Sequence, residues 1–101
     1  MTLYELTKDA ENDLKEIARY TLNNHGIKQL QLYRGKIKDK LNKIAHGEVM
    51  ARSFSETLPQ VLVTRCEHHL IFYITESREK PVIIGIIHEN RDIVSHIKSR
   101  I

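Results

Sequence analysis

Two amphipathic helical patterns, separated by a four-residue stop, constrain the fold of this 101-residue chain more than any other feature. The first has spacings of 4, 3, 1 and 3, and comprises Ala10, Leu14, Ile17, Ala18 and Thr21. The second has spacings of 3, 4, 4 and 3, and comprises Leu30, Tyr33, Ile37, Leu41 and Ile44. Each set lies on one face of an α-helix. The stop is residues 23–26, where Gly26 is free to adopt a left-handed conformation. Because so short a turn makes helices antiparallel, the pattern predicts a helical hairpin.

Short β-forming segments follow the hairpin. We expect Thr7 to cap the first helix and His46-Gly47 to end the second. Segments 61–65, 70–75 and 82–88 are rich in β-branched and aromatic residues, whereas residues 49–54 have weaker strand character. Turns are expected at residues 67–68 and 77–81, so the three strands should form an antiparallel meander. Their near-continuous apolar runs imply either cover on both faces or one face reserved for a partner.

The C-terminal residues predict one more short helix. Ile93, Ile97 and Ile101 are four apart and follow Asp92, which is a suitable N-cap. The predicted fold class is therefore α+β, a single domain over residues 1–101. It consists of a helical hairpin packed on a small, mainly antiparallel sheet, with a short C-terminal helix or tail.

Charge is unevenly distributed along the chain. Residues 1–26 carry three bases and five acids, and residues 27–46 carry six bases and one acid. The remaining residues are balanced at seven of each. The basic segment would suit an acidic partner or nucleic acid, but a solvated helix face is the commoner explanation of such a charge run. One cysteine and the absence of a long apolar run predict a soluble, cytoplasmic protein.

No metal, cofactor or nucleophile is predicted. The four glycines are scattered, so there is no phosphate-binding loop. His68 and His69 are the only adjacent histidines, and neighbours on a strand point to opposite faces, so we do not expect them to share an ion. Cys66 precedes Glu67, whose negative charge disfavours a reactive thiolate.

A cationic and aromatic set in the second half leaves a catalytic hypothesis open. The set is Arg52, Arg65, His68, His69, Tyr73, His88 and Arg91. Metal-free RNA cleavage needs a general base, a cation for the developing charge and a general acid, which these residue types supply. The competing interpretation is structural. In that reading Tyr73 is in the core, Arg65 is a sheet-edge charge and His88 caps a strand end.

Three motifs, in order, resemble those of ParE-type toxins of the ParE/RelE superfamily. They are Leu6-Thr7-x-x-Ala10 with Asp13-Leu14-x-x-Ile17, then Arg65 with His69-x-Ile71-Phe72-Tyr73, and finally Ile84-x-Ile86-Ile87-His88-x-x-Arg91-Asp92. The resemblance covers nearly the whole chain and implies that residues 3–6 form a first strand. The chain has no terminal Tyr of the kind that RelE-type ribonucleases commonly carry, so it is more similar to ParE.

The resemblance implies a toxin that inhibits DNA gyrase without catalysis and is neutralised by a ParD-like antitoxin that wraps it. For the target contact it points to the last strand and tail, namely His88, Arg91, Lys98 and Arg100. For the antitoxin we expect the hairpin groove and the apolar sheet, represented by Leu14, Ile37, Leu41, Phe72 and Ile84.

Two alternatives remain open. One is a RelE-like, ribosome-dependent mRNA endoribonuclease that uses Arg65, His88 and Arg91. The other is a binding module that is no longer toxic.

Overall fold

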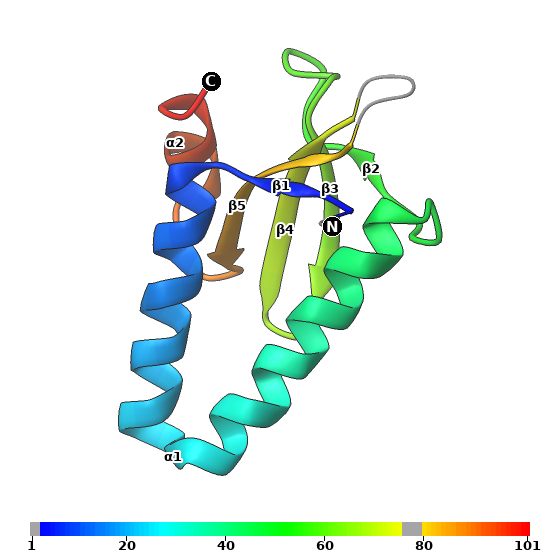
Figure 1. Ribbon diagram of the computed structural model, residues 1–101. Helices are drawn as coiled ribbons and strands as arrows, with labels where there is room; N and C mark the ends of the chain where they lie inside the picture. Colours follow the sequence, from blue (N-terminus) through cyan, green and yellow to red (C-terminus); the bar gives the residue numbers. More distant parts are fainter. Residues whose placement is uncertain (1–2, 76–79) are drawn as a thin grey trace.

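The predicted hairpin consists of two helical arms, which share the label α1 and meet at a kink. The computed structural model describes residues 3–75 and 80–101. Helix α1 (Lys8–Ala45) bends at Gly26, where φ is 86° and ψ is 175°. Only glycine adopts these angles without strain, so this residue sets the position of the bend. A first arm (residues 8–25) and a second arm (residues 27–45) diverge from it (Figure 1).

Both ends of α1 lie where the sequence predicts them. The Thr7 side chain accepts a hydrogen bond from the Ala10 N–H at 3.1 Å, which satisfies one of the free donors of the first turn. His46 is the C-cap and donates its backbone N–H to the carbonyls of Asn42 and Ile44.

The sheet has five strands in the order β1-β5-β4-β3-β2. They are β1 (Glu5–Leu6), β2 (Arg52–Ser53), β3 (Leu62–Cys66), β4 (His69–Ile74) and β5 (Val82–His88). β1 pairs in parallel with β5, and the other pairs are antiparallel. The predicted α+β class, the meander and the first strand are confirmed, and the weak strand in residues 49–54 is reduced to the two residues of β2. Part of the turn predicted at residues 77–81 lies outside the described residues.

The middle strands are covered on both faces, which decides between the two readings of their apolar runs. Hairpin residues pack on one face, with the core side chains Ala10, Ile37, Leu41, Ile44, Cys66, Ile71, Tyr73, Ile83 and Ile86. The other face carries a second core of Val61, Val63, Phe72, Ile84, Ile87 and Ile97. Alternate residues of β4 therefore enter different cores, as the pleat of a strand requires.

A β-bulge interrupts β5. Phe72 pairs with Gly85, but Tyr73 pairs with Ile83, so Ile84 is the extra residue on the bulged strand. The extra residue reverses the alternation of the strand, because Ile83 and Ile86, three apart, both enter the core on the hairpin side.

Helix α2 (Ile93–Lys98) closes the second core through Ile97, which has no exposed surface. The Asp92 side chain accepts hydrogen bonds from the N–H and hydroxyl of Ser95, and these bonds lower the pKa of the Asp92 carboxyl. The helix ends before Ile101, which is 54% exposed, so the expectation that Ile101 continues the apolar helical face is wrong. No helix in residues 3–75 and 80–101 has the length and apolar character of a membrane-spanning segment.

Candidate functional site

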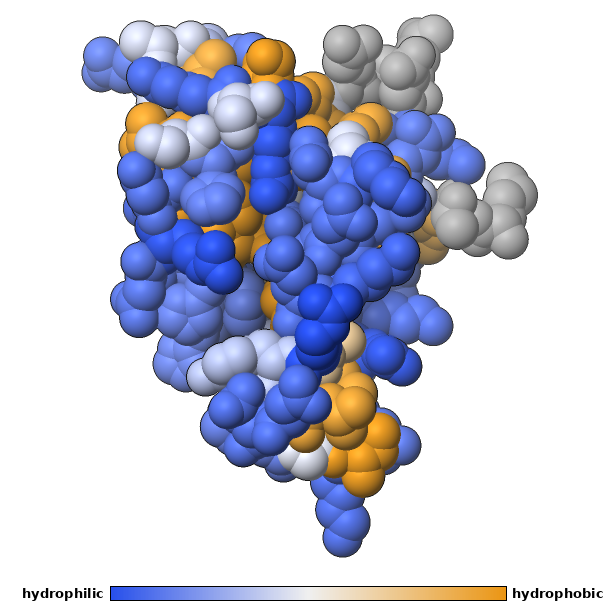
Figure 2. All heavy atoms as spheres, turned by 90° about the vertical axis from the view of Figure 1, so that its left-hand side faces the viewer, coloured by the Kyte–Doolittle hydropathy of each residue, from blue (hydrophilic) through white to orange (hydrophobic). Residues whose placement is uncertain are grey.

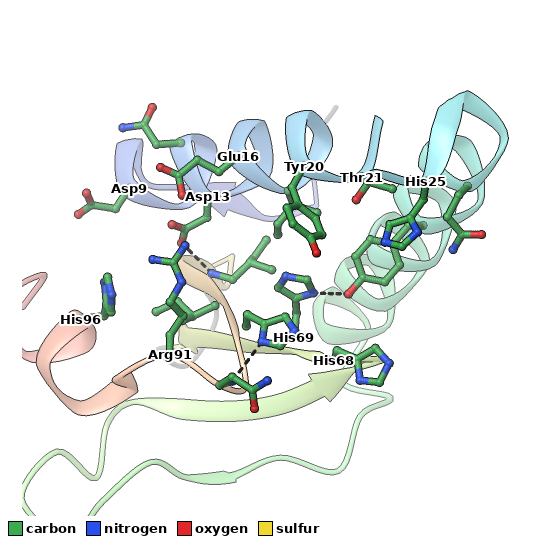
Figure 3. A pocket seen from close by; sticks show the side chains of 18 of the residues that line it. Asp9, Asp13, Glu16, Tyr20, Thr21, His25, His68, His69, Arg91 and His96 are labelled. Atoms are coloured by element: carbon green, nitrogen blue, oxygen red, sulfur yellow. Dashed lines mark hydrogen bonds between the residues drawn. The ribbon is translucent and has the colours of Figure 1, made fainter. Parts of the chain in front are cut away.

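A cleft of about 990 Å³ separates the first arm of α1 from the end of β5 and from α2. Five of the six histidines of the chain line it, and we call it the histidine cleft. These are His25, His68, His69, His88 and His96. Asp9, Asp13 and Glu16 of the first arm face them, and Arg91 extends into the cleft from the opposite side (Figure 3). One wall thus carries carboxylates, and the other carries histidines and an arginine.

The deepest contact in the cleft joins the second arm to the sheet. The Tyr33 hydroxyl donates its proton to the Cys66 carbonyl oxygen at 3.3 Å and is also hydrogen-bonded to Nδ1 of His69. The ring of His88 meets that of His69 edge-on, with centroids 5.2 Å apart. Burial, with smaller contributions from His88 and His68, lowers the pKa of His69 to about 4. At neutral pH His69 is therefore an uncharged ring that accepts a proton poorly.

His68 lies in the turn between β3 and β4 rather than in the strand. Both adjacent imidazoles therefore reach the same cleft, and the expectation that they face opposite ways is wrong because it assumed strand geometry. Among the described residues, no group of three or more His, Cys, Asp or Glu side chains has the arrangement of a metal site.

Three other members of the catalytic set, Arg65, His88 and Tyr73, occupy structural positions. Arg65 is paired with Glu89 at 2.5 Å and does not line the cleft. His88 Nδ1 accepts the Asn90 N–H at 3.1 Å, which is a cap at the end of a strand. Tyr73 is 5% exposed in the core. Cys66 is also buried, and burial, reinforced by Glu67, raises the pKa of its thiol.

Arg100 is held inside the molecule by Asp13. The guanidinium donates to both carboxylate oxygens, at 2.6 and 3.0 Å, and each side chain is 12% exposed. The same pair satisfies the edge of β5, since Arg100 donates to the Ile84 carbonyl and Asp13 accepts the Ile86 N–H. The hydrogen bond with Asp13 raises the pKa of Arg100, so the guanidinium stays charged.

The outward side of the C-terminal segment is apolar and basic. Val94 is 50% exposed and Ile101 54% exposed, and Lys98 between them is exposed. We call these three residues the C-terminal face. Of the four residues predicted to contact the target, Lys98 lies on this face, His88 and Arg91 line the histidine cleft, and Arg100 is paired with Asp13.

A second hollow, of about 310 Å³, lies between the two arms of α1 and the first strand. We call it the hairpin groove. Leu14, Ile37 and Leu41, three of the five residues predicted for the antitoxin, line it, but Ile37 and Leu41 are themselves buried in the core on the hairpin side. Basic side chains that also line it are Lys15, Arg34 and Lys38. The other two, Phe72 and Ile84, are buried in the second core. The structure therefore does not bring these five residues together.

Figure 2 shows that the side of the molecule bearing the first arm is mostly hydrophilic. A hydrophobic patch appears at its lower end, where α1 bends. Exposed apolar residues on either side of the bend are Leu22 and Ile27, at 45% and 56% exposure.

A family model for the ParE toxin of the type II toxin–antitoxin system parDE matches residues 4–93. The chain belongs to the ParE toxin family. A curated protein from Escherichia coli, Toxin ParE, is 35% identical over 101 residues, which are 100% of this chain and 98% of that protein. A solved structure described as the chromosomal ParDE TA system from P. aeruginosa has a TM-score of 0.68 and 18% identity. The match covers 85% of this chain and 96% of the chain in the solved structure, and it shows a shared fold.

Membership of the ParE toxin family confirms the resemblance seen in the three motifs. Sequence reasoning missed two features of the site within that family fold. It placed Tyr33 on an apolar helical face, and did not foresee that its hydroxyl reaches His69. The resemblance pointed to Arg100 as part of the C-terminal tail, and sequence reasoning did not connect it to Asp13, which is 87 residues away in the chain. The one sequence signal for the Asp13–Arg100 contact was that Asp13 is a polar residue within the first helical motif.

Proposed function

We propose that this chain inhibits DNA gyrase, without catalysing a reaction of its own, and is neutralised by a ParD-like antitoxin. The supporting observation is membership of the ParE toxin family over nearly the whole chain. Gyrase acts on the chromosome, so the place of action is the cytoplasm.

The C-terminal face is the proposed gyrase contact. Val94 and Ile101 expose apolar surface beside Lys98, and no ion pair to Lys98 is found within the described residues. Exposed apolar area flanked by charge is typical of a surface that binds another protein. Arg91, which lines the histidine cleft, adds a second exposed cation near the start of α2.

The hairpin groove is the proposed antitoxin contact. Its apolar lining accepts one side of an amphipathic segment, and Lys15, Arg34 and Lys38 favour an acidic one. A disordered antitoxin segment that folds on binding gains this apolar burial together with charge complementarity. Phe72 and Ile84 would be reached only by a partner that opened the second core.

Gyrase supercoiling and DNA-cleavage assays with the purified protein test the main proposal. We expect loss of supercoiling or accumulation of cleaved plasmid. The double variant V94S/K98Q should weaken inhibition at least tenfold, whereas L22S, at the exposed bend, should leave it unchanged. Unaffected gyrase at stoichiometric protein would refute the proposal. It would direct attention to mRNA cleavage on the ribosome or to a chain that is not toxic.

Binding of the cognate antitoxin, measured by calorimetry, tests the groove. The variant R34E/K38E should weaken binding at least tenfold, since it reverses two charges at the groove. K28E/K43E makes the same charge change on the same arm outside the groove and is the matched control. Equal effects of the two variants would show that only net charge matters.

A further inference from the structure

We propose that the Asp13–Arg100 pair positions the C-terminal face, and that Arg100 serves the target contact through Asp13 rather than by touching the target. This inference rests on the proposed function, because it concerns how the gyrase contact is held in place. It gives Asp13, a residue of the first arm, a role in orienting the C-terminal segment.

The geometry of the pair suits it to fix one segment of the chain relative to another. Two charge-assisted hydrogen bonds form a bidentate contact, which fixes orientation as well as distance. Each partner makes one further bond to β5, to the Ile84 carbonyl and the Ile86 N–H. The pair thus connects three parts of the chain: the first arm, β5 and the C-terminal segment.

The backbone of β5 is shaped for this contact. Gly85, beneath the guanidinium, leaves room for it, since a Cβ there would lie 2.7 Å from Nη1 of Arg100. The bulge at Ile84 reverses the alternation of the strand, so the Ile84 carbonyl and the Ile86 N–H both face Asp13 and Arg100 instead of β4. These are two independent adjustments of one strand to the same side-chain pair.

The segment that the pair holds needs such support. Helix α2 has six residues, too few to be stable by itself in water. Ile97 attaches it to the second core, and Arg100 attaches the chain that follows. Arg100 lies between Lys98 and Ile101, two of the three residues of the C-terminal face, so its attachment determines where they point.

Direct contact with the target would require Arg100 to leave this site. Only 12% of its side chain is exposed, and its hydrogen bonds to Asp13 and Ile84 would be lost. Lys98 and Arg91 are exposed and make no such contacts within the described residues. They are better placed to meet a partner.

The test compares D13N, R100Q and R100K with the wild-type full chain. Amide hydrogen exchange of residues 93–101 measures attachment, and gyrase inhibition measures function. We expect D13N and R100Q each to increase exchange at least tenfold in the tail but not in α1, and to weaken inhibition at least tenfold. The double variant D13N/R100Q should be no worse than either single one. R100K, which keeps the charge but loses the bidentate contact, should fall between wild type and R100Q.

K98Q provides the contrast, because a contact residue should weaken inhibition without changing exchange. Full inhibition by D13N together with loss in R100Q would overturn the inference in favour of direct contact by Arg100. Unchanged tail exchange in both single variants would overturn it as well, and exchange confined to the tail excludes global unfolding as the cause. If the wild-type chain does not inhibit gyrase, the proposed function fails, yet the exchange data still decide whether the pair holds the tail.

Discussion

The stability of this protein should depend on the protonation of His69. The pKa of this ring is about 4 in the folded protein and about 6.5 in the unfolded chain, because burial and the neighbouring His88 and His68 disfavour its charged form. Between these values the unfolded chain binds a proton that the folded protein does not. By linkage, the contribution of His69 is complete above pH 6.5 and is lost progressively as the pH falls towards 4.

The magnitude follows from the same two pKa values. At full burial they correspond to about 3 kcal/mol of unfolding free energy. Because the ring is only partly buried, water screens part of this difference, and we expect about 1.5 kcal/mol to be lost between pH 7 and about pH 4.5. The negative charges of Asp13 and Glu89 raise the pKa of His69, and the value of about 4 already includes this effect.

Urea unfolding of the wild-type protein and of H69Q at both pH values measures the effect. Gln keeps a polar side chain that can hydrogen-bond the Tyr33 hydroxyl but does not titrate, so the variant should lose about 1.5 kcal/mol less stability on acidification. H25Q removes an exposed histidine of the same cleft and should behave as wild type. An identical pH dependence for wild type and H69Q would refute the reasoning, because carboxylates elsewhere would then account for the whole acid transition.

Three further expectations concern packing and backbone geometry. Gly85→Ala places a Cβ 2.7 Å from Arg100 Nη1 and should cost about 2–3 kcal/mol of unfolding free energy. Gly35→Ala, in an open helical position, should instead gain about 1 kcal/mol. Thermal unfolding of both variants distinguishes them, and equal shifts would argue against the close approach at Gly85. Gly26→Ala imposes a side chain at φ 86° and ψ 175° and should cost about 1–3 kcal/mol in the same assay, with a neutral result showing that the bend does not need glycine. Cys66, with a buried thiol of raised pKa, should react with Ellman's reagent about 100-fold more slowly in the native protein than in guanidinium, and comparable rates would mean that this part of the sheet opens readily.

Local sequence signals were sufficient for α1, with its cap and its bend, and for the three strands of the meander. The two helical patterns, the stop at Gly26 and the cap at Thr7 depend on residues close in the chain, so they can be read without knowledge of the whole structure. The meander followed for the same reason, since short connections leave few ways to pair three strands. The parallel pairing of β1 with β5 needed the family resemblance, because residues 3–6 carry too little pattern by themselves.

The positions of the charged and titratable side chains were beyond this kind of reasoning. Arg100 appeared to be a free basic residue of the tail, and only folding brings it to Asp13. His68 and His69 appeared to face opposite ways, and only the tight turn, in which Glu67 adopts a φ of 56°, directs both to one cleft. In each case the partner lies far along the chain or the backbone departs from the regular strand.

The sequence by itself determined the order of helices and strands, the location of the hairpin bend and the family to which the chain belongs. These depend on periodicity, capping and short motifs, each set by interactions over a few residues. Tertiary structure alone decided that Phe72 and Ile84 are covered, that five histidines share a cleft, and that Arg100 is largely buried in an ion pair with Asp13. The physical reason is that a side chain's exposure and charge environment depend on what packs against it, and most of that comes from elsewhere in the chain.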